Sequence, residues 1–129
     1  MQPPKQKKIL IVDDAGYIRI LFREALKNEG YEILTCENIA SAYETIIQTK
    51  PALMLLDISL PDGSGVDLLK QLRKERIVLP VIMITAVSSK DLVLEALKLG
   101  IKSYLTKPVD IRILKLRVKE ALDEPIPEN

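Results

Sequence analysis

Three residue types suited to phosphoryl chemistry stand at widely separated points of the sequence. Carboxylates occur at Asp13, Asp14 and Asp57, a hydroxyl occurs at Thr85 and an ammonium at Lys107, each at or just after the end of a short apolar run. A carboxylate can act as a nucleophile, and a metal, a hydroxyl and an ammonium can stabilise charge on a transferred group. If the fold brings these side chains together, they predict a phosphoryl-transfer site.

Three neighbouring carboxylates repel one another, and their proton affinities rise unless another charge offsets them. One lysine does not balance three acids, so a hard divalent cation is the natural counter-charge. The chain has no histidine and a single cysteine, which leaves oxygen atoms as the ligands. Oxygen ligands favour Mg²⁺ or Mn²⁺ over zinc, and Mg²⁺ completes its shell with waters and phosphate. The lack of histidine also excludes a histidine-based catalytic triad.

Size and composition predict one ordinary globular domain. The chain has 129 residues, of which 47% are hydrophobic, enough for a full core and too many for a disordered chain. Its net charge of +1 argues against a direct nucleic-acid surface. The lone Cys36 cannot form an internal disulfide, which suits a reducing compartment. With no signal peptide and no apolar run near the roughly 20 residues of a membrane span, we expect a cytoplasmic protein.

Hydrophobic periodicity predicts five strands that alternate with five helices. The strands are expected at 8–12, 31–35, 53–56, 81–84 and 103–105. The helices are expected at 17–29, 39–49, 66–74, 90–99 and 111–122, with a turn-rich loop at 59–65. Helix caps are expected at Asn38, at Ser88 or Ser89 and at Asp110. We expect one domain at 8–122 with tails at 1–7 and 123–129, the second of them frayed.

This alternation predicts an α/β, doubly wound (βα)5 flavodoxin-like fold with a five-stranded parallel sheet in the order 2-1-3-4-5. Ligands bind such sheets outside the carboxyl ends of the strands, at the switch point between the first and third strands. Asp13 and Asp14 end the first strand and Asp57 ends the third. Thr85 and Lys107 follow the fourth and fifth strands, so all five polar residues should meet at one rim.

The motifs Ile-Val-Asp13-Asp14, Leu-Leu-Asp57-Ile-Ser-Leu-Pro-Asp-Gly-Ser-Gly65, Ile-Thr85-Ala86 and Lys107-Pro108 resemble those of the receiver domains of bacterial response regulators. Each motif alone is weak, but all of them in order, each at a strand end, are specific. The resemblance covers nearly the whole chain. It implies that Asp57 is the phosphoacceptor, that Asp14 binds Mg²⁺ directly and Asp13 through water, and that the Ser59 backbone carbonyl completes the protein ligands.

The resemblance also implies the remaining site residues. Thr85, Lys107 and the backbone N–H groups of Ser59 and Ala86 would contact the phosphoryl group. Thr85 and Tyr104 would form the switch, and the Lys107–Pro108 peptide would be cis. Family members vary at the second position after the phosphoacceptor and after the switch threonine, which here are Ser59 and Val87. Val87 is apolar where some relatives carry an acid or amide, and we expect it to slow attack by water on the acyl phosphate. Val109 stands where phenylalanine is common.

We expect a stand-alone receiver of the phosphorelay type, because the sequence around helix 17–29 resembles that type more than the chemotaxis type; a fragment of a larger regulator is the alternative. The phosphoryl donor would be a histidine kinase, a His-phosphotransfer protein or a small phosphodonor. The chain would be a switch with only self-catalysed phosphorylation and dephosphorylation, not an enzyme, and a monomer or weak dimer. A downstream protein would bind an apolar partner face made of Leu94, Tyr104, Ile113 and Leu116, and Ile20 would face a partner's helical bundle.

Plainer interpretations stay open at this point. Asp13 and Asp14 fit helix caps, Asp57 fits a turn, and Thr85, Lys107 and the partner-face residues fit ordinary strand and surface positions. Two other functions compete with the switch. A haloacid dehalogenase-type phosphatase needs a second acid where this chain has Ser59, and a flavin or nucleotide carrier needs a glycine-rich phosphate loop that is missing after the first strand. Turnover of a phosphate ester, or a bound yellow colour, would favour them.

Overall fold

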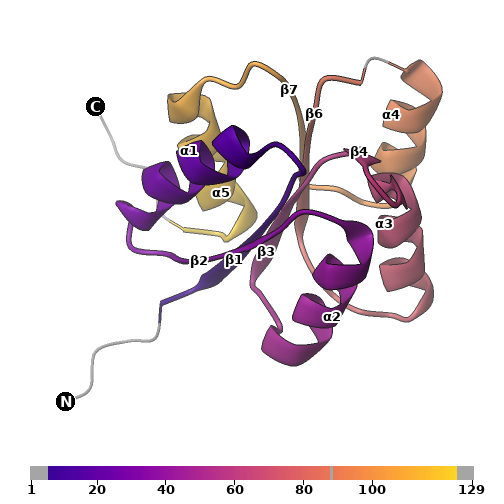
Figure 1. Ribbon diagram of the computed structural model, residues 1–129, viewed down its shortest axis with the longest axis horizontal. Helices are drawn as coiled ribbons and strands as arrows, with labels where there is room; N and C mark the ends of the chain where they lie inside the picture. The colour runs from indigo at the N-terminus through magenta and orange to yellow at the C-terminus, as the bar shows by residue number, and fades with distance from the viewer. Residues whose placement is uncertain (1–5, 88, 125–129) are drawn as a thin grey trace.

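The computed structural model describes residues 6–87 and 89–124, which form a central parallel sheet with helices on both faces (Figure 1). The sheet strands are β1 (Lys8–Val12), β2 (Glu32–Cys36), β3 (Leu53–Leu56), β6 (Val81–Thr85) and β7 (Ser103–Thr106). The helices are α1 (Gly16–Lys27), α2 (Ile39–Thr49), α3 (Gly65–Lys74), α4 (Lys90–Lys98) and α5 (Ile111–Ala121). None of these helices has the length and apolar character needed to cross a bilayer.

The strand order is β2-β1-β3-β6-β7, and all four neighbouring pairs are parallel. This is the predicted 2-1-3-4-5 order, because two further strands stand apart from the sheet. β4 (Ser59–Leu60) and β5 (Gly63–Ser64) form a small antiparallel hairpin where we predicted only a loop. Each of these strands has two residues, too few to show an alternating pattern in the sequence.

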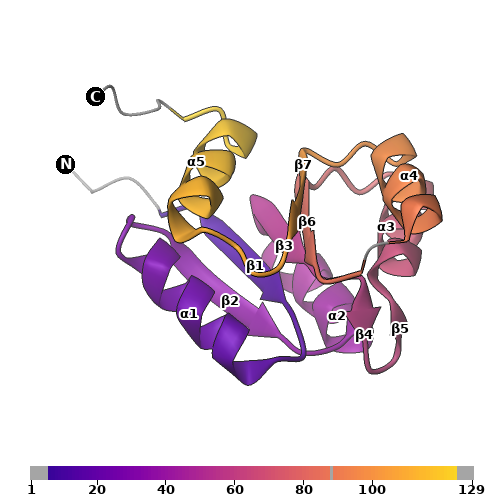
Figure 2. The ribbon, with the colours of Figure 1, turned by 90° about the horizontal axis from the view of Figure 1, so that it is seen from above.

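The alternation of strand side chains divides the core into two layers, one on each face of the sheet. Leu10 and Val12 of β1 pack with buried residues of α2, α3 and α4. Ile9 and Ile11 of the same strand pack with buried residues of α1 and α5. Figure 2 shows these two helix groups on opposite sides of the sheet. Both faces are therefore covered, which explains the continuous apolar strands.

Most predicted element ends lie within two residues of the observed ones. The side chains of Asn38, Ser89 and Asp110 accept hydrogen bonds at the starts of α2, α4 and α5, as predicted. Ser88, the alternative cap of α4, lies outside the described residues. β2 begins at Glu32 and not at Tyr31, because Lys8 pairs with Glu32 at the start of the ladder. 

The predicted tails are only partly described, since residues 1–5 and 125–129 lie outside the described ranges. In the described part of the tails, Lys7 and Glu124 form an ion pair, with Nζ of Lys7 2.9 Å from a carboxylate oxygen of Glu124. The Tyr31 hydroxyl donates a hydrogen bond of 2.5 Å to the same carboxylate. Glu124, the second residue of the predicted C-terminal tail, therefore contacts both Lys7 and Tyr31, and the expected fraying of this tail stays a prediction.

Candidate phosphoryl-transfer site

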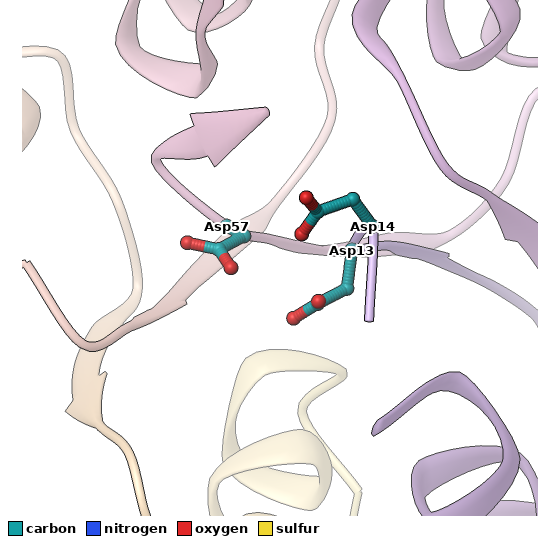
Figure 3. A group of neighbouring side chains, drawn as sticks. All are labelled: Asp13, Asp14 and Asp57. Atoms are coloured by element: carbon teal, nitrogen blue, oxygen red, sulfur yellow. The ribbon is translucent and has the colours of Figure 1, made fainter. Parts of the chain in front are cut away.

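The three acidic residues of the sequence motif meet at the carboxyl edge of the sheet. Asp13 and Asp14 follow β1, and Asp57 follows β3; the two strands pair through Val12 and Leu56, the last residue of each. Carboxylate oxygens of the three residues lie within 4.8 Å of one another. In Figure 3, Asp13 and Asp14 extend from the end of β1 toward the side of Asp57.

Lys107 reaches into this cluster from the loop after β7. Its Nζ lies 2.6 Å from Oδ2 of Asp13 and 2.7 Å from Oδ2 of Asp57, and donates a hydrogen bond to each. Its backbone N–H donates to the carbonyl of Thr85, which ties the lysine loop to the end of β6. The peptide bond between Lys107 and Pro108 is cis.

Burial sets the electrostatics of the cluster, because Asp13 is 3% and Asp57 5% exposed. Burial raises the pKa of Asp13, and the hydrogen bonds from Lys107 and the Ala15 N–H oppose that rise only in part. Burial alone would lower the pKa of Lys107, but its hydrogen bonds and charge interactions with Asp13 and Asp57 together outweigh burial, so this pKa is raised. Lys107 therefore stays charged at neutral pH.

The donor set fits a divalent cation. When ionised, three carboxylates and one ammonium leave two negative charges within a few ångströms. Both oxygens of Asp13 already accept hydrogen bonds, one from the Ala15 N–H at 2.9 Å and one from Lys107. Asp14 is exposed, so its carboxylate is accessible to a ligand. Neither residue caps α1, whose N-cap is Ala15 with no side-chain hydrogen bond.

The segment after Asp57 is held by a close backbone approach that sequence reasoning missed. The Ser59 N–H donates to Oδ1 of Asp57 at 3.2 Å, and the Gly65 N–H donates to the Ile58 carbonyl at 2.7 Å. A Cβ at Gly65 would lie 2.1 Å from the backbone oxygen of Asp57. We interpreted Gly65 only as a turn residue, whereas the Asp57 backbone leaves no space for a side chain at this position.

The β6 side of the site holds the two predicted switch residues. Thr85 is fully buried, and its hydroxyl oxygen accepts a hydrogen bond from the Val87 N–H at 3.2 Å. Tyr104, half-buried on β7, donates its hydroxyl to the Val87 carbonyl at 2.8 Å. Burial, and then the charge of Asp57, raise the pKa of Tyr104. The backbone of Val87 therefore links Thr85 to Tyr104. Ala86, which lies between Thr85 and Val87 in the sequence, is exposed.

Two contacts that support the site have no signal in the sequence. The carboxylate of Asp62 accepts hydrogen bonds from the Ile39 and Ala40 N–H groups at 2.8 and 3.0 Å, which joins the β4–β5 hairpin to the start of α2. Arg19 of α1 donates to the backbone carbonyl of Asp13 at 2.6 Å. The Asp62 contacts connect segments far apart in sequence, whereas the Arg19 contact spans only the turn from β1 into α1.

The predicted partner residues are placed on the surface to different degrees. Ile20, Leu94 and Ile113 are 56%, 55% and 39% exposed. Leu116 and Tyr104 are half-buried. Further exposed apolar side chains, which we did not single out, lie on α1 at Tyr17 and Leu21 and on α4 at Leu97. Helices α1 and α4 thus expose more apolar side chains than we predicted.

Residues 9–119 match the family described as "Response regulator receiver domain". The phosphate regulon transcriptional regulatory protein PhoB of Pseudomonas aeruginosa is 41% identical over 118 residues, which cover 90% of this chain and 52% of PhoB. The chain thus spans about half the length of that relative. Sporulation initiation phosphotransferase F of Bacillus subtilis is 35% identical over 116 residues, which cover 90% of this chain and 94% of that protein.

Solved structures show the same relationship. The crystal structure of a CheY-like response regulator receiver domain protein from Methanospirillum hungatei JF-1 matches with a TM-score of 0.88 at 35% identity, covering 92% of this chain and 95% of that one. Family match, relatives and fold agree with the acidic site at the carboxyl edge of the sheet. The chain therefore belongs to the response regulator receiver domain family.

Proposed function

We propose that this chain accepts a phosphoryl group on Asp57 from a phosphohistidine donor. The observation that carries the proposal is the contact of Lys107 with both Asp57 and Asp13, at 2.7 and 2.6 Å, inside a buried acidic cluster. Such a cluster combines a nucleophilic carboxylate with a fixed cation. Since the chain has no histidine, the phosphohistidine belongs to another protein, a histidine kinase or a His-phosphotransfer protein, and a small phosphodonor is the alternative source.

The chemistry assigns a role to each residue at the rim. A carboxylate oxygen of Asp57 forms a bond to phosphorus, the P–N bond of the donor breaks, and the imidazole nitrogen leaves with the electron pair. Lys107 pairs with one phosphoryl oxygen, and Thr85 and the N–H groups of Ser59 and Ala86 donate to the others. Each of these donors stabilises charge that is present on the transferred group.

Mg²⁺, or Mn²⁺ in its place, would be held by Asp14, Asp57 and the Ser59 carbonyl, with Asp13 acting through water. When bound, the cation supplies positive charge that offsets the carboxylates and the phosphoryl oxygens. The accessible carboxylate of Asp14 and the two occupied oxygens of Asp13 support this division of roles.

The phosphorylated chain either switches a downstream partner or passes the phosphoryl group on. For the first route, Thr85 moves toward the phosphoryl group, and Tyr104 follows through the shared contact with Val87, which changes the α4–β7–α5 face with Leu94, Ile113 and Leu116. For the second route, Ile20 on α1 meets the partner's helices. The likeness to sporulation initiation phosphotransferase F supports the second route.

We propose the following setting for this chemistry. Residues 8–122 form the receiver unit, which acts in the cytoplasm as a monomer or weak dimer and turns over no external substrate. Ser59 stands two residues after Asp57, where the haloacid dehalogenase-type phosphatase needs an acid, so the switch is favoured over that enzyme.

The test is the intact mass of the chain after incubation with acetyl phosphate and Mg²⁺. We expect a gain of one phosphoryl group, which is absent in Asp57→Asn and after addition of EDTA. If acetyl phosphate gives no gain, the same assay is repeated with a phosphorylated His-phosphotransfer protein. No gain from either donor, with the chain folded, would contradict the proposal.

A further inference from the structure

Arg19, in the first turn of α1, contacts the acidic cluster from a side that the proposed chemistry does not use. Its Nη1 donates a hydrogen bond of 2.6 Å to the backbone carbonyl of Asp13. Its other partner is Glu37, whose side chain is 66% exposed and lies 3.6 Å from Nη2. Because an exposed pair at that distance contributes little, the Asp13 carbonyl is the principal partner of Arg19.

Asp13 is held at each of its other polar atoms as well. Its N–H donates to the Cys36 carbonyl at 3.1 Å. Its Oδ1 accepts from the Ala15 N–H at 2.9 Å, and its Oδ2 accepts from Lys107 at 2.6 Å. Arg19 completes this set at the carbonyl, and that carbonyl belongs to the peptide unit that joins Asp13 to Asp14.

The position of Asp14 depends on this peptide unit. A peptide is planar, so fixing its carbonyl also fixes the direction in which the chain enters the next residue. Asp14 is exposed, and α1 begins two residues later with no side-chain cap. The short connection from β1 to α1 therefore depends on backbone contacts, and Arg19 provides one of them through a charged donor.

We infer that Arg19 is a positioning residue for the metal site: it fixes the peptide between Asp13 and Asp14 and so aims the Asp14 carboxylate toward Asp57. This inference rests on the proposed function, since it assigns Asp14 as a metal ligand. Groups that orient metal ligands from outside the coordination shell typically change metal affinity by about 10- to 100-fold when they are removed. 

The competing role for Arg19 is that of a charge alone, and it predicts the opposite sign. A guanidinium near the cluster repels a divalent cation, so its removal would strengthen Mg²⁺ binding. Arg19→Lys keeps the charge but replaces the planar fork with a single ammonium, so a charge role leaves affinity unchanged in this variant. A positioning role instead weakens Mg²⁺ binding in both Arg19→Ala and Arg19→Lys, more in the alanine variant.

The experiment measures the Mg²⁺ dissociation constant of the full chain by isothermal titration calorimetry, without any phosphodonor. The variants are Arg19→Ala, Arg19→Lys and the control Arg23→Ala, which removes an exposed arginine one turn further along α1. We expect the dissociation constant to rise by about tenfold or more in Arg19→Ala and by less in Arg19→Lys, with no change in Arg23→Ala. Thermal unfolding of each variant separates lost binding from lost folding.

Unchanged or tighter binding in Arg19→Ala would overturn the inference while leaving the proposed function intact. If Arg19→Ala does not fold, wild-type affinity in Arg19→Lys would overturn it in the same way. Wild-type chain that binds no Mg²⁺ would contradict the metal role in the proposed function, and the inference would fall with it.

Discussion

Two clusters of lysine and carboxylate lie at opposite ends of β1, and they differ in burial and in charge balance. Before the strand, Lys7 and Glu124 pair at 2.9 Å with side chains 44% and 22% exposed. Beyond the strand, Lys107 and Asp57 pair at 2.7 Å with side chains 17% and 6% exposed. The first cluster has one cation for one carboxylate and the hydroxyl of Tyr31, whereas the second has one cation for three acids.

This difference separates a contact that joins chain ends from one that prepares a binding site. The balanced, exposed cluster closes upon itself and has little left to offer a ligand. The buried cluster keeps unbalanced negative charge, which costs folding free energy until a cation or a proton offsets it. The proposed function at the carboxyl end of the sheet therefore depends on a cluster of buried carboxylates that lowers the stability of the fold.

The packing around Asp57 provides the most severe test of this contrast. Gly65→Ala is expected to lower the free energy of unfolding by about 3 kcal/mol, because the new Cβ must displace backbone and not a flexible side chain. Gly16→Ala is the matched control, since its Cβ would meet only the Arg19 guanidinium at 3.7 Å. Urea unfolding measures both, and equal stabilities would show that the segment after Asp57 is not tightly held.

Mg²⁺ should stabilise the chain through the carboxyl-end cluster. At a free concentration on the order of 100 times its dissociation constant, a ligand that binds only the folded state adds about 2.7 kcal/mol to the free energy of unfolding. We expect this gain in urea titrations with Mg²⁺ and its loss in Asp14→Asn. A Glu124→Gln variant should keep the full gain; if it does not, the cation is acting at the wrong end of β1.

Removal of each lysine compares the two clusters directly. Lys107→Met leaves buried carboxylates without their cation, and without metal it should lower the free energy of unfolding by about 2 kcal/mol. This loss is smaller than for a fully buried ion pair, because the Lys107 ammonium is partly exposed. Lys7→Met should cost below about 1 kcal/mol. Both are measured by urea unfolding with EDTA at neutral pH, and similar losses would remove the distinction between the clusters.

The pH dependence should have opposite signs at the two ends. Burial alone would raise the pKa of Glu124, but hydrogen bonds from Tyr31 and Lys7 outweigh burial, so this pKa lies below its ordinary value. Ionised Glu124 therefore stabilises the fold above that ordinary value, and the contribution is lost as the pH falls through the folded-state pKa. The pKa of Asp13 is raised by burial, so its contribution is present in acid and is lost as the pH rises through the folded-state pKa.

Two variants in EDTA test these signs across a series of pH values. Glu124→Gln should lower stability at neutral pH by less than about 1 kcal/mol and should have no effect in strong acid. Asp13→Asn removes a carboxylate whose ionisation costs stability. The free energy of unfolding of this variant, relative to wild type, should therefore be higher at neutral pH than in acid. Two variants that respond to pH in the same direction would contradict the assigned pKa shifts.

The sequence was enough to predict the sheet and the rim of the site, because apolar runs and caps are local signals. β1, α2 and β3 begin and end where predicted. The β4–β5 hairpin could not be predicted, since its strands have two residues each. The close approach of Gly65 to Asp57, and the contact of Arg19 with Asp13, depend on the exact path of the backbone through two short connections. Hydrophobic periodicity and residue type do not specify that path.

The decisive measurement is the position of the phosphoryl group after transfer from a phosphorylated His-phosphotransfer protein. Borohydride reduces an acyl phosphate of aspartate to homoserine, which peptide mass spectrometry then locates in the sequence. We expect homoserine at residue 57 alone, and none in Asp57→Asn or in EDTA. Homoserine at residue 13 or 14, or none anywhere in the folded wild-type chain, would contradict the assignment of Asp57 as the phosphoacceptor.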